Sequence, residues 1–297
     1  MRTAYLGTSD FAVAVLERLA DSPHRPALVV TRPDRPAGRG RRLSPPPVAR
    51  LARSLDLPLA QPENVNDEGA RAQIAAVAPD VVVVCAFGAL IREELLAAHE
   101  LLNVHPSLLP RWRGAAPIER AIIAGDRETG VAIMRVTAGL DSGPVCLCER
   151  EPIRGDDTFG TLSARLARLG GELLVRALDE RPAFEEQSDD GVTYAEKITA
   201  DDRALDPACP AVELERTVRA LSPHIGARLA LPGGSEYLGV WSAQPAAPVE
   251  HEPGWLGSEG GRLLLSCAAG SALELLTVQP PGKRPMPAAD YLRGHAL

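Results

Sequence analysis

The sequence predicts an α/β domain with a mostly parallel sheet, followed by a smaller antiparallel β domain. Apolar runs near the N-terminus alternate with helical patterns at the spacing of βαβ units. Residues 81–84 are four consecutive valines, typical of a parallel strand covered on both faces. Beyond residue 208, Gly and Pro separate brief apolar runs, which suits a small antiparallel barrel. A length of 297 residues is comfortable for two such domains.

The N-terminal part begins with an expected strand at Ala4–Gly7, a helix at Phe11–Leu19 and a second strand at Ala27–Thr31. The turn after the first strand lacks G-x-G-x-x-G, so the sequence gives little support to a dinucleotide cofactor. The next expected elements are, in order, a helix over 48–55, a strand over 58–60, a helix over 68–77, a strand over 80–87, a helix over 91–98, a strand over 101–104, a helix over 116–124, strands over 131–136 and 145–149, and a long helix over 158–178.

A change of character follows the long helix. Residues 181–207 mix Pro, Asp, Glu and Gln with little periodicity, as expected for a linker. We therefore predict a catalytic domain over 1–188, a linker over 189–207 and a C-terminal domain over 208–297. The C-terminal elements expected are a helix over 212–221 and strands over 228–231, 237–241, 262–267 and 272–276.

Composition excludes several classes of protein. The formal net charge of -7 argues against coating nucleic acid by bulk electrostatics, although a local basic patch stays open. The five cysteines form no CxxC pair, which indicates a reducing compartment and no zinc site. Asp10 and Glu17 interrupt any signal-peptide core, and the longest apolar run is too short to span a bilayer. We expect a soluble cytoplasmic chain.

The first candidate site is the pair Asn103 and His105, at the end of the strand over 101–104. Residues two apart in a strand point to the same face, so the two side chains should project together. Pro106 and Pro110 then lead the chain out of the sheet. A carboxamide can donate to an oxyanion, and an imidazole can move a proton near neutral pH. The alternative is a turn in which both side chains satisfy local backbone groups.

The second candidate is Asp141, which lies between Gly139 and Gly143. Glycines on both sides let the backbone turn tightly around a carboxylate that could orient an imidazole and favour its charged form. The alternative is a turn aspartate that bonds its own backbone. Chemistry by Asn, His and Asp without a metal or a covalent nucleophile fits transfer of an activated acyl group to an amine.

The third candidate is an arginine-rich segment over 31–47, rich in Pro and Gly, which indicate irregular structure. Only Asp34 offsets its arginines. Guanidinium groups bind phosphate well, so one hypothesis is that this segment contacts an RNA backbone. The alternative is a solvated loop without a partner. The arginines are Arg32, Arg35, Arg39, Arg41 and Arg42.

These motifs together resemble a known family. The segments 103–110, 113–117 and 139–143 are similar to the signature of the methionyl-tRNA formyltransferases. The segments 33–40 and 193–198 separate that family from other folate-dependent formyltransferases. A further segment over 281–286 resembles a third family motif. The resemblance covers essentially the whole chain.

The resemblance implies a Rossmann-like catalytic domain joined by a linker to an OB-like barrel. It implies transfer of the formyl group of 10-formyltetrahydrofolate to the α-amino group of methionine on initiator Met-tRNA. Asn103, His105 and Asp141 would take the catalytic places. The folate site would be lined by Phe87, Gly88, Ala89, Leu90, Ser107, Leu108, Leu109 and Pro110. The tRNA would contact Arg35, Arg39, Arg41, Arg42, Lys283 and Arg284. We expect a monomer without a metal, DNA or membrane partner.

Two residues depart from the family pattern: Ser9 stands where Pro is usual, and Phe87 where Tyr is common. From Asp206 onward, nine acidic side chains stand against seven basic ones, so tRNA contact there requires a clustered basic face. The main alternative function is a formyltransferase acting on an amino sugar or nucleotide sugar. A hydrolase that releases formate and a non-catalytic RNA-binding module are further alternatives. The arginine-rich segment and the barrel favour tRNA, because a small substrate needs neither.

Overall fold

The computed structural model describes residues 1–37, 42–231 and 236–295, without the side chains of Ala37 and Arg42. It divides into two compact units. Unit 1 comprises residues 1–114, 128–152 and 163–194. Unit 2 comprises residues 115–127, 153–162 and 195–297.

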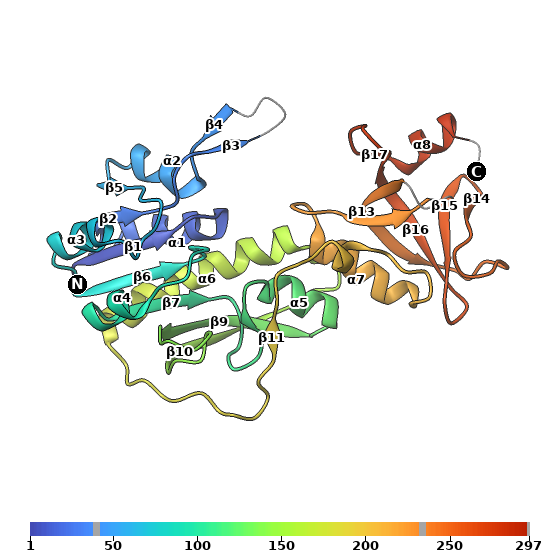
Figure 1. Cartoon of the computed structure of the whole chain (residues 1–297). Helices are drawn as coiled ribbons and strands as arrows, with labels where there is room; N and C mark the ends of the chain where they lie inside the picture. The colour runs from blue at the N-terminus through green and yellow to red at the C-terminus, as the bar shows by residue number, and fades with distance from the viewer. Residues whose placement is uncertain (38–41, 232–235, 296–297) are drawn as a thin grey trace. The chain divides into compact units, whose positions relative to one another are not determined.

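Unit 1 is built on a seven-stranded sheet in the order β10-β9-β7-β6-β1-β2-β5 (Figure 1). The five strands from β5 to β7 in this order run parallel, while β9 runs antiparallel to β7 and to β10. The prediction of a mostly parallel sheet is therefore confirmed. The strands are β1 (Thr3–Gly7), β2 (Pro26–Val30), β5 (Leu59–Ala60), β6 (Val81–Cys85), β7 (Leu101–His105), β9 (Glu128–Arg135) and β10 (Val145–Pro152).

The helices of unit 1 agree closely with the predicted ranges. They are α1 (Asp10–Ala20), α2 (Pro47–Ser54), α3 (Glu68–Ala76), α4 (Glu93–Ala98) and all but the first turn of α6 (Phe159–Glu180). Two glycines let α6 approach its neighbours closely. A Cβ on Gly170 would come within 2.8 Å of Val104 Cγ1, and one on Gly171 within 2.8 Å of Arg18 Cβ. The helix thereby packs against both β7 and α1 and buries the strand that carries Asn103 and His105.

The arginine-rich segment contains regular structure, contrary to the expectation of an irregular loop. β3 (Arg35–Ala37) and β4 (Arg42–Ser44) pair antiparallel and form an arm that projects from the body of unit 1 (Figure 1). Proline lacks a backbone donor, but a two-stranded ribbon leaves one side of each strand unpaired. Pro36, opposite Leu43, is therefore compatible with the ladder.

Two very short strands pair next to the segment that follows β7. β8 (Arg113–Gly114) and β11 (Tyr194–Ala195) form a two-stranded sheet. Neither strand was predicted, since each has only two residues. Within unit 1, the Arg113 N–H donates to the Thr193 carbonyl at 2.9 Å, so the segment predicted as a linker is hydrogen-bonded at Thr193.

Unit 2 contains a six-stranded sheet in which every pairing is antiparallel, in the order β12-β13-β16-β15-β14 with β17 on β16. The predicted C-terminal antiparallel β domain is confirmed. Its strands are β12 (Ala227–Ala230), β13 (Tyr237–Ala246), β14 (Leu256–Glu259), β15 (Arg262–Cys267), β16 (Ser271–Gln279) and β17 (Met286–Pro287). Its helices are α5 (Pro117–Ala124), the first turn of α6, the 3-10 helix η1 (Asp201–Arg203), α7 (Ala211–Leu221) and α8 (Ala288–Gly294).

An apolar cluster stabilises the β domain. Leu214 and Val218 of α7 pack with Leu238, Leu263 and other side chains of the strands, all of them buried. Alternating burial along β13 shows that one face of the sheet points to this core. In the described part of the chain, none of the helices has the length and apolar character needed to cross a membrane.

Candidate active site

Asn103 and His105 lie at the carboxyl end of β7 and both face Asp141, from the loop between β9 and β10. Asn103 Nδ2 lies 3.4 Å from Asp141 Oδ1, and His105 Nδ1 lies 3.7 Å from Asp141 Oδ2. The structure thus brings together the three residues that the sequence singled out. The side chain of His105 is only 4% exposed, whereas that of Asp141 is 19% exposed. The carboxylate therefore lies between the buried imidazole and solvent.

The imidazole of His105 has a defined tautomer. Its Nε2 lies 2.9 Å from the Trp112 carbonyl oxygen. A carbonyl only accepts hydrogen bonds, so Nε2 carries a hydrogen in both charge states of the ring. The nitrogen that gains and loses a proton is therefore Nδ1, which faces Asp141. The Ser107 hydroxyl donates to the Arg111 carbonyl at 2.7 Å and closes the turn that brings Trp112 back to the imidazole.

The backbone around Asp141 is held in an uncommon conformation. Asp141 has φ +42°, in the left-handed region that most residues avoid. Its Oδ2 accepts a hydrogen bond from the Gly114 N–H at 2.9 Å. Gly114 has φ +122°, which only glycine adopts readily. The carboxylate is thus fixed by a backbone donor that sequence reasoning did not identify.

Sequence reasoning also missed Gln187, which lies in the polar, aperiodic stretch at the end of the predicted catalytic domain. Its Nε2 donates to the carbonyl oxygens of Asp141 at 2.9 Å and Gly143 at 2.7 Å. Its Oε1 accepts from Arg113 Nε at 3.0 Å and Nη2 at 2.8 Å. A glutamine in a polar, aperiodic stretch gives no local signal for such a role.

The first candidate folate segment, 87–90, leaves the carboxyl end of β6, next to β7 in the sheet. Phe87 is buried, while Gly88, Ala89 and Leu90 are exposed. The Thr8 hydroxyl donates to the Phe87 carbonyl at 2.8 Å, which ties this loop to the turn after β1. Open α/β sheets bind ligands at this edge.

The second candidate folate segment, 107–110, leaves the same edge because β6 and β7 are parallel neighbours. Ser107 is fully buried, and Leu108, Leu109 and Pro110 are partly exposed. A Cβ on Gly130 of β9 would come within 2.5 Å of Leu108 Cδ2, so a glycine there makes room for this segment. Both segments therefore lie at the edge that carries Asn103 and His105.

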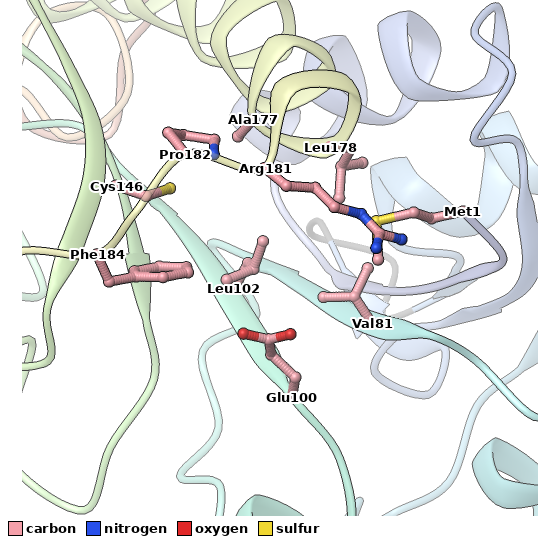
Figure 2. A pocket seen from close by; sticks show the side chains of 10 residues that line it. All are labelled: Met1, Val81, Glu100, Leu102, Cys146, Ala177, Leu178, Arg181, Pro182 and Phe184. Carbon is pink, nitrogen blue, oxygen red and sulfur yellow. The ribbon is translucent and has the colours of Figure 1, made fainter.

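A small, mostly apolar cavity of about 150 Å³ lies at the opposite edge of the same sheet. It adjoins the amino ends of β6, β7 and β10, and Figure 2 shows the side chains that line it. They are Met1, Val81, Glu100, Leu102, Cys146, Ala177, Leu178, Arg181, Pro182 and Phe184. Burial raises the pKa of the Cys146 thiol, which disfavours its reactive thiolate form. The cavity does not belong to the candidate site.

Among the described residues, no group of three or more His, Cys, Asp or Glu side chains could hold a metal ion.

The candidate tRNA residues of unit 1 belong to the arginine-rich segment, of which the structure describes β3 and β4. Arg35 is exposed and pairs with Glu63, which offsets its charge. Arg39 and Arg41 lie outside the described residues, and Arg42 lies in β4 without a described side chain.

In unit 2, Lys283 and Arg284 are exposed on the turn between β16 and β17. The adjoining Gly282 lines a groove of about 190 Å³. Arg203 and Arg228 line the same groove, and the Arg228 guanidinium lies 6.0 Å from the centre of the Tyr237 ring. Burial and the charge of Arg228 lower the pKa of Arg203. The groove thus combines two neighbouring cations with an exposed aromatic ring.

Comparison with known proteins identifies close relatives. A model of the formyl transferase family matches residues 1–178, and a model of the formyl transferase C-terminal domain matches residues 197–296. The chain is 47% identical over 303 residues to methionyl-tRNA formyltransferase from Halorhodospira halophila, covering 100% of this chain and 97% of that protein. It is 44% identical over 304 residues to methionyl-tRNA formyltransferase from Methylococcus capsulatus, covering 100% and 98%.

Solved structures with low sequence identity share the fold. HypX from Aquifex aeolicus in complex with tetrahydrofolic acid aligns with a TM-score of 0.67 at 17% identity. The alignment covers 98% of this chain but 47% of HypX, so the chain spans about half of that protein. An N-formyltransferase from Helicobacter canadensis, in complex with folinic acid and dTDP-3-aminofucose, aligns with a TM-score of 0.67 at 14% identity, covering 93% and 98% of the two chains.

Proposed function

The chain belongs to the methionyl-tRNA formyltransferase family, and we propose that it transfers the formyl group of 10-formyltetrahydrofolate to the α-amino group of methionine on initiator Met-tRNA. The observation that carries the chemistry is the convergence of Asn103, His105 and Asp141 at the carboxyl edge of the sheet. The acceptor is supported by relatives of matching length, in contrast to sugar-acting neighbours that share only the fold. The proposed partners are initiator Met-tRNA and folate. We further propose that the protein is a cytoplasmic monomer that binds no metal, DNA or membrane.

The proposed reaction is a direct transfer. The neutral amine attacks the formyl carbon, a new C–N bond forms, and the carbonyl oxygen becomes an oxyanion that accepts a hydrogen bond from Asn103 Nδ2. The C–N bond to the folate then breaks, and the proton lost by the amine reaches the departing folate nitrogen through His105 Nδ1. Nδ1 serves this role because Nε2 is committed to the Trp112 carbonyl. Asp141 orients the ring from the Nδ1 side.

We infer that folate binds against the segments 87–90 and 107–110, since both leave the sheet beside Asn103. Exposed Leu90 offers apolar contact area at this rim. In unit 2, the groove beside Lys283 and Arg284 supports contact with tRNA, because cations and aromatic rings together suit phosphates and bases.

Formylation of charged tRNA tests the proposal directly. Purified protein is mixed with 10-formyltetrahydrofolate and initiator Met-tRNA, and formyl-methionine on the tRNA is followed over time. Uncharged tRNA and a small amino sugar serve as parallel acceptors. Rapid formylation of the charged tRNA alone is the expected result. Formyl transfer to the sugar or to water instead would overturn the acceptor while retaining the chemistry.

The arginine-rich arm allows a second test. Neutralising Arg39, Arg41 and Arg42 should raise KM for Met-tRNA and weaken its salt dependence, because fewer counterions are released from the phosphates. The matched control neutralises three exposed arginines elsewhere in unit 1, which should leave the salt slope unchanged. An unchanged slope in the arm variant would rule out its phosphate role. The control positions are Arg150, Arg168 and Arg176.

A further inference from the structure

Gln187 uses the full hydrogen-bonding capacity of its amide group next to the candidate active site. Both Nε2 hydrogens go to carbonyl oxygens of the Asp141 turn, at 2.9 and 2.7 Å. Oε1 accepts two hydrogen bonds from the Arg113 guanidinium, at 3.0 and 2.8 Å. All four partners fix which end of the amide is oxygen, because a flipped amide would set NH₂ against a cation and oxygen against two carbonyls.

These bonds close a ring of contacts around the Asp141 carboxylate. The residue after Arg113 is Gly114, whose N–H donates to Asp141 Oδ2 at 2.9 Å. Gln187 therefore links the strand that holds the carboxylate to the turn that carries it. Thr193 fixes the same strand from the other side, since its carbonyl accepts from the Arg113 N–H at 2.9 Å. Movement of the strand with Gly114, or of the turn with Asp141, would change the distance between Asp141 and His105.

The turn needs such external support. Asp141 has φ +42°, and a non-glycine residue keeps the left-handed conformation only where its surroundings hold it. Gln187 bonds two carbonyls that follow this position in the turn, those of Asp141 and Gly143. These are the bonds that oppose relaxation of the turn. The side chain comes from 46 residues further along the chain.

We propose that Gln187 is a positioning residue, which holds the Asp141 turn so that the carboxylate faces Nδ1 of His105. The proposal rests on the proposed function, because it assigns Gln187 a part in the same proton transfer. Gln187 does not touch the reacting groups and acts only through Asp141. Its removal should therefore lower kcat while leaving binding of Met-tRNA intact.

The first test compares two substitutions with a neighbouring control. Gln187→Ala removes all four bonds, whereas Gln187→Glu keeps the shape and the Arg113 contact but cannot donate to the turn when ionised. Both should lower kcat about 10-fold or more, as expected for a small misplacement, with KM for Met-tRNA within about two-fold. Exposed Glu186→Gln should behave as wild type. Wild-type kcat in folded Gln187→Ala or Gln187→Glu, checked by circular dichroism, would overturn the proposal.

A double-mutant cycle then asks whether Gln187 acts through Asp141. Adding Gln187→Ala to Asp141→Asn should cause little further loss of kcat, because the carboxylate that Gln187 positions is already gone. Multiplication of the two single losses would show that Gln187 acts elsewhere and would overturn the proposal.

A third measurement separates this proposal from the function itself. The imidazole nitrogen signals of His105, assigned with a His105→Gln variant, are recorded by NMR on ¹⁵N-histidine-labelled protein. Gln187→Ala should shift the His105 signals in the same direction as Asp141→Asn, whatever the acceptor of the formyl group. Unchanged signals would overturn the positioning role. Wild-type protein that fails to formylate Met-tRNA would overturn the proposed function, and the NMR result would then decide the role of Gln187.

Discussion

The two units each contain an aspartate that accepts a hydrogen bond from a backbone N–H and lies beside a basic side chain, but the two carboxylates differ in how many hydrogen bonds they accept. In unit 2, Asp202 accepts from Arg120 Nη1 at 2.6 Å and Nη2 at 3.0 Å. It also accepts from the N–H and the hydroxyl of Thr199, both at 2.8 Å. These hydrogen bonds, led by those from Arg120, lower the pKa of Asp202 to about 2.

In unit 1, the Asp141 carboxylate accepts one short hydrogen bond from the described residues, from the Gly114 N–H at 2.9 Å. The Asn103 and His105 contacts are longer, at 3.4 and 3.7 Å, and the backbone at Asp141 is left-handed. Asp202 already accepts four hydrogen bonds, about as many as a carboxylate can accept, which leaves little capacity for a substrate or a moving proton. Asp141 retains that capacity. The comparison therefore supports our proposal that Asp141 serves the reaction, at some cost in backbone strain, and leads us to infer that Asp202 serves stability.

The largest expected effect comes from the site itself. Asn103→Ala should lower kcat about 10²–10³-fold, the size expected when one oxyanion donor is removed. Stopped-flow or quench measurements of Met-tRNA formylation under single-turnover conditions would isolate the chemical step. The melting temperature should change little, because Asn103 makes only the long contact with Asp141 among the described side chains. Full activity in this variant would remove Asn103 from the mechanism.

Matched substitutions of the two aspartates test the comparison directly. Asp141→Asn should lower kcat about 10–100-fold, because general acid–base catalysis loses the group that orients the imidazole. Its stability should be retained, because asparagine tolerates the left-handed conformation. Asp202→Asn should leave kcat unchanged and reduce the free energy of unfolding by about 1–2 kcal/mol, since it breaks charge-assisted bonds to Arg120. Urea unfolding and formylation assays on both variants check all four outcomes. The reverse pattern would contradict the division of roles.

The sequence predicts the parts of the site that depend on local periodicity. The two-residue spacing of Asn103 and His105 places both on one face of β7, and the valines of β6 predict a buried parallel neighbour. These patterns locate the edge of the sheet that carries both residues. Asp141 is found from the glycines around it, although its left-handed backbone is not.

The rest of the site depends on contacts between distant parts of the chain. Gln187 bonds Arg113 from 74 residues away, and nothing in a polar segment indicates that partner. The β3–β4 arm pairs across a stretch whose Pro and Gly content suggests an irregular loop. The short elements β14, β17 and α8 were also missed, because their length gives too few repeats of any hydrophobic period.

The smallest expected effect concerns pH and the Asp202 carboxylate. Because its pKa is about 2 in the folded chain, against 3.8 for a free side chain, the folded state binds this proton less readily than the unfolded state. The resulting stability is present above pH 4 and is lost as the pH falls through about 2. The difference in unfolding free energy between wild type and Asp202→Asn should therefore narrow from pH 5 towards pH 3, measured by urea titration.

Asp201→Asn, made on the exposed neighbour, controls for the loss of a surface charge. A difference that stays constant over this range would mean that Asp202 is not held by Arg120 in solution, and the contrast with Asp141 would lose its basis.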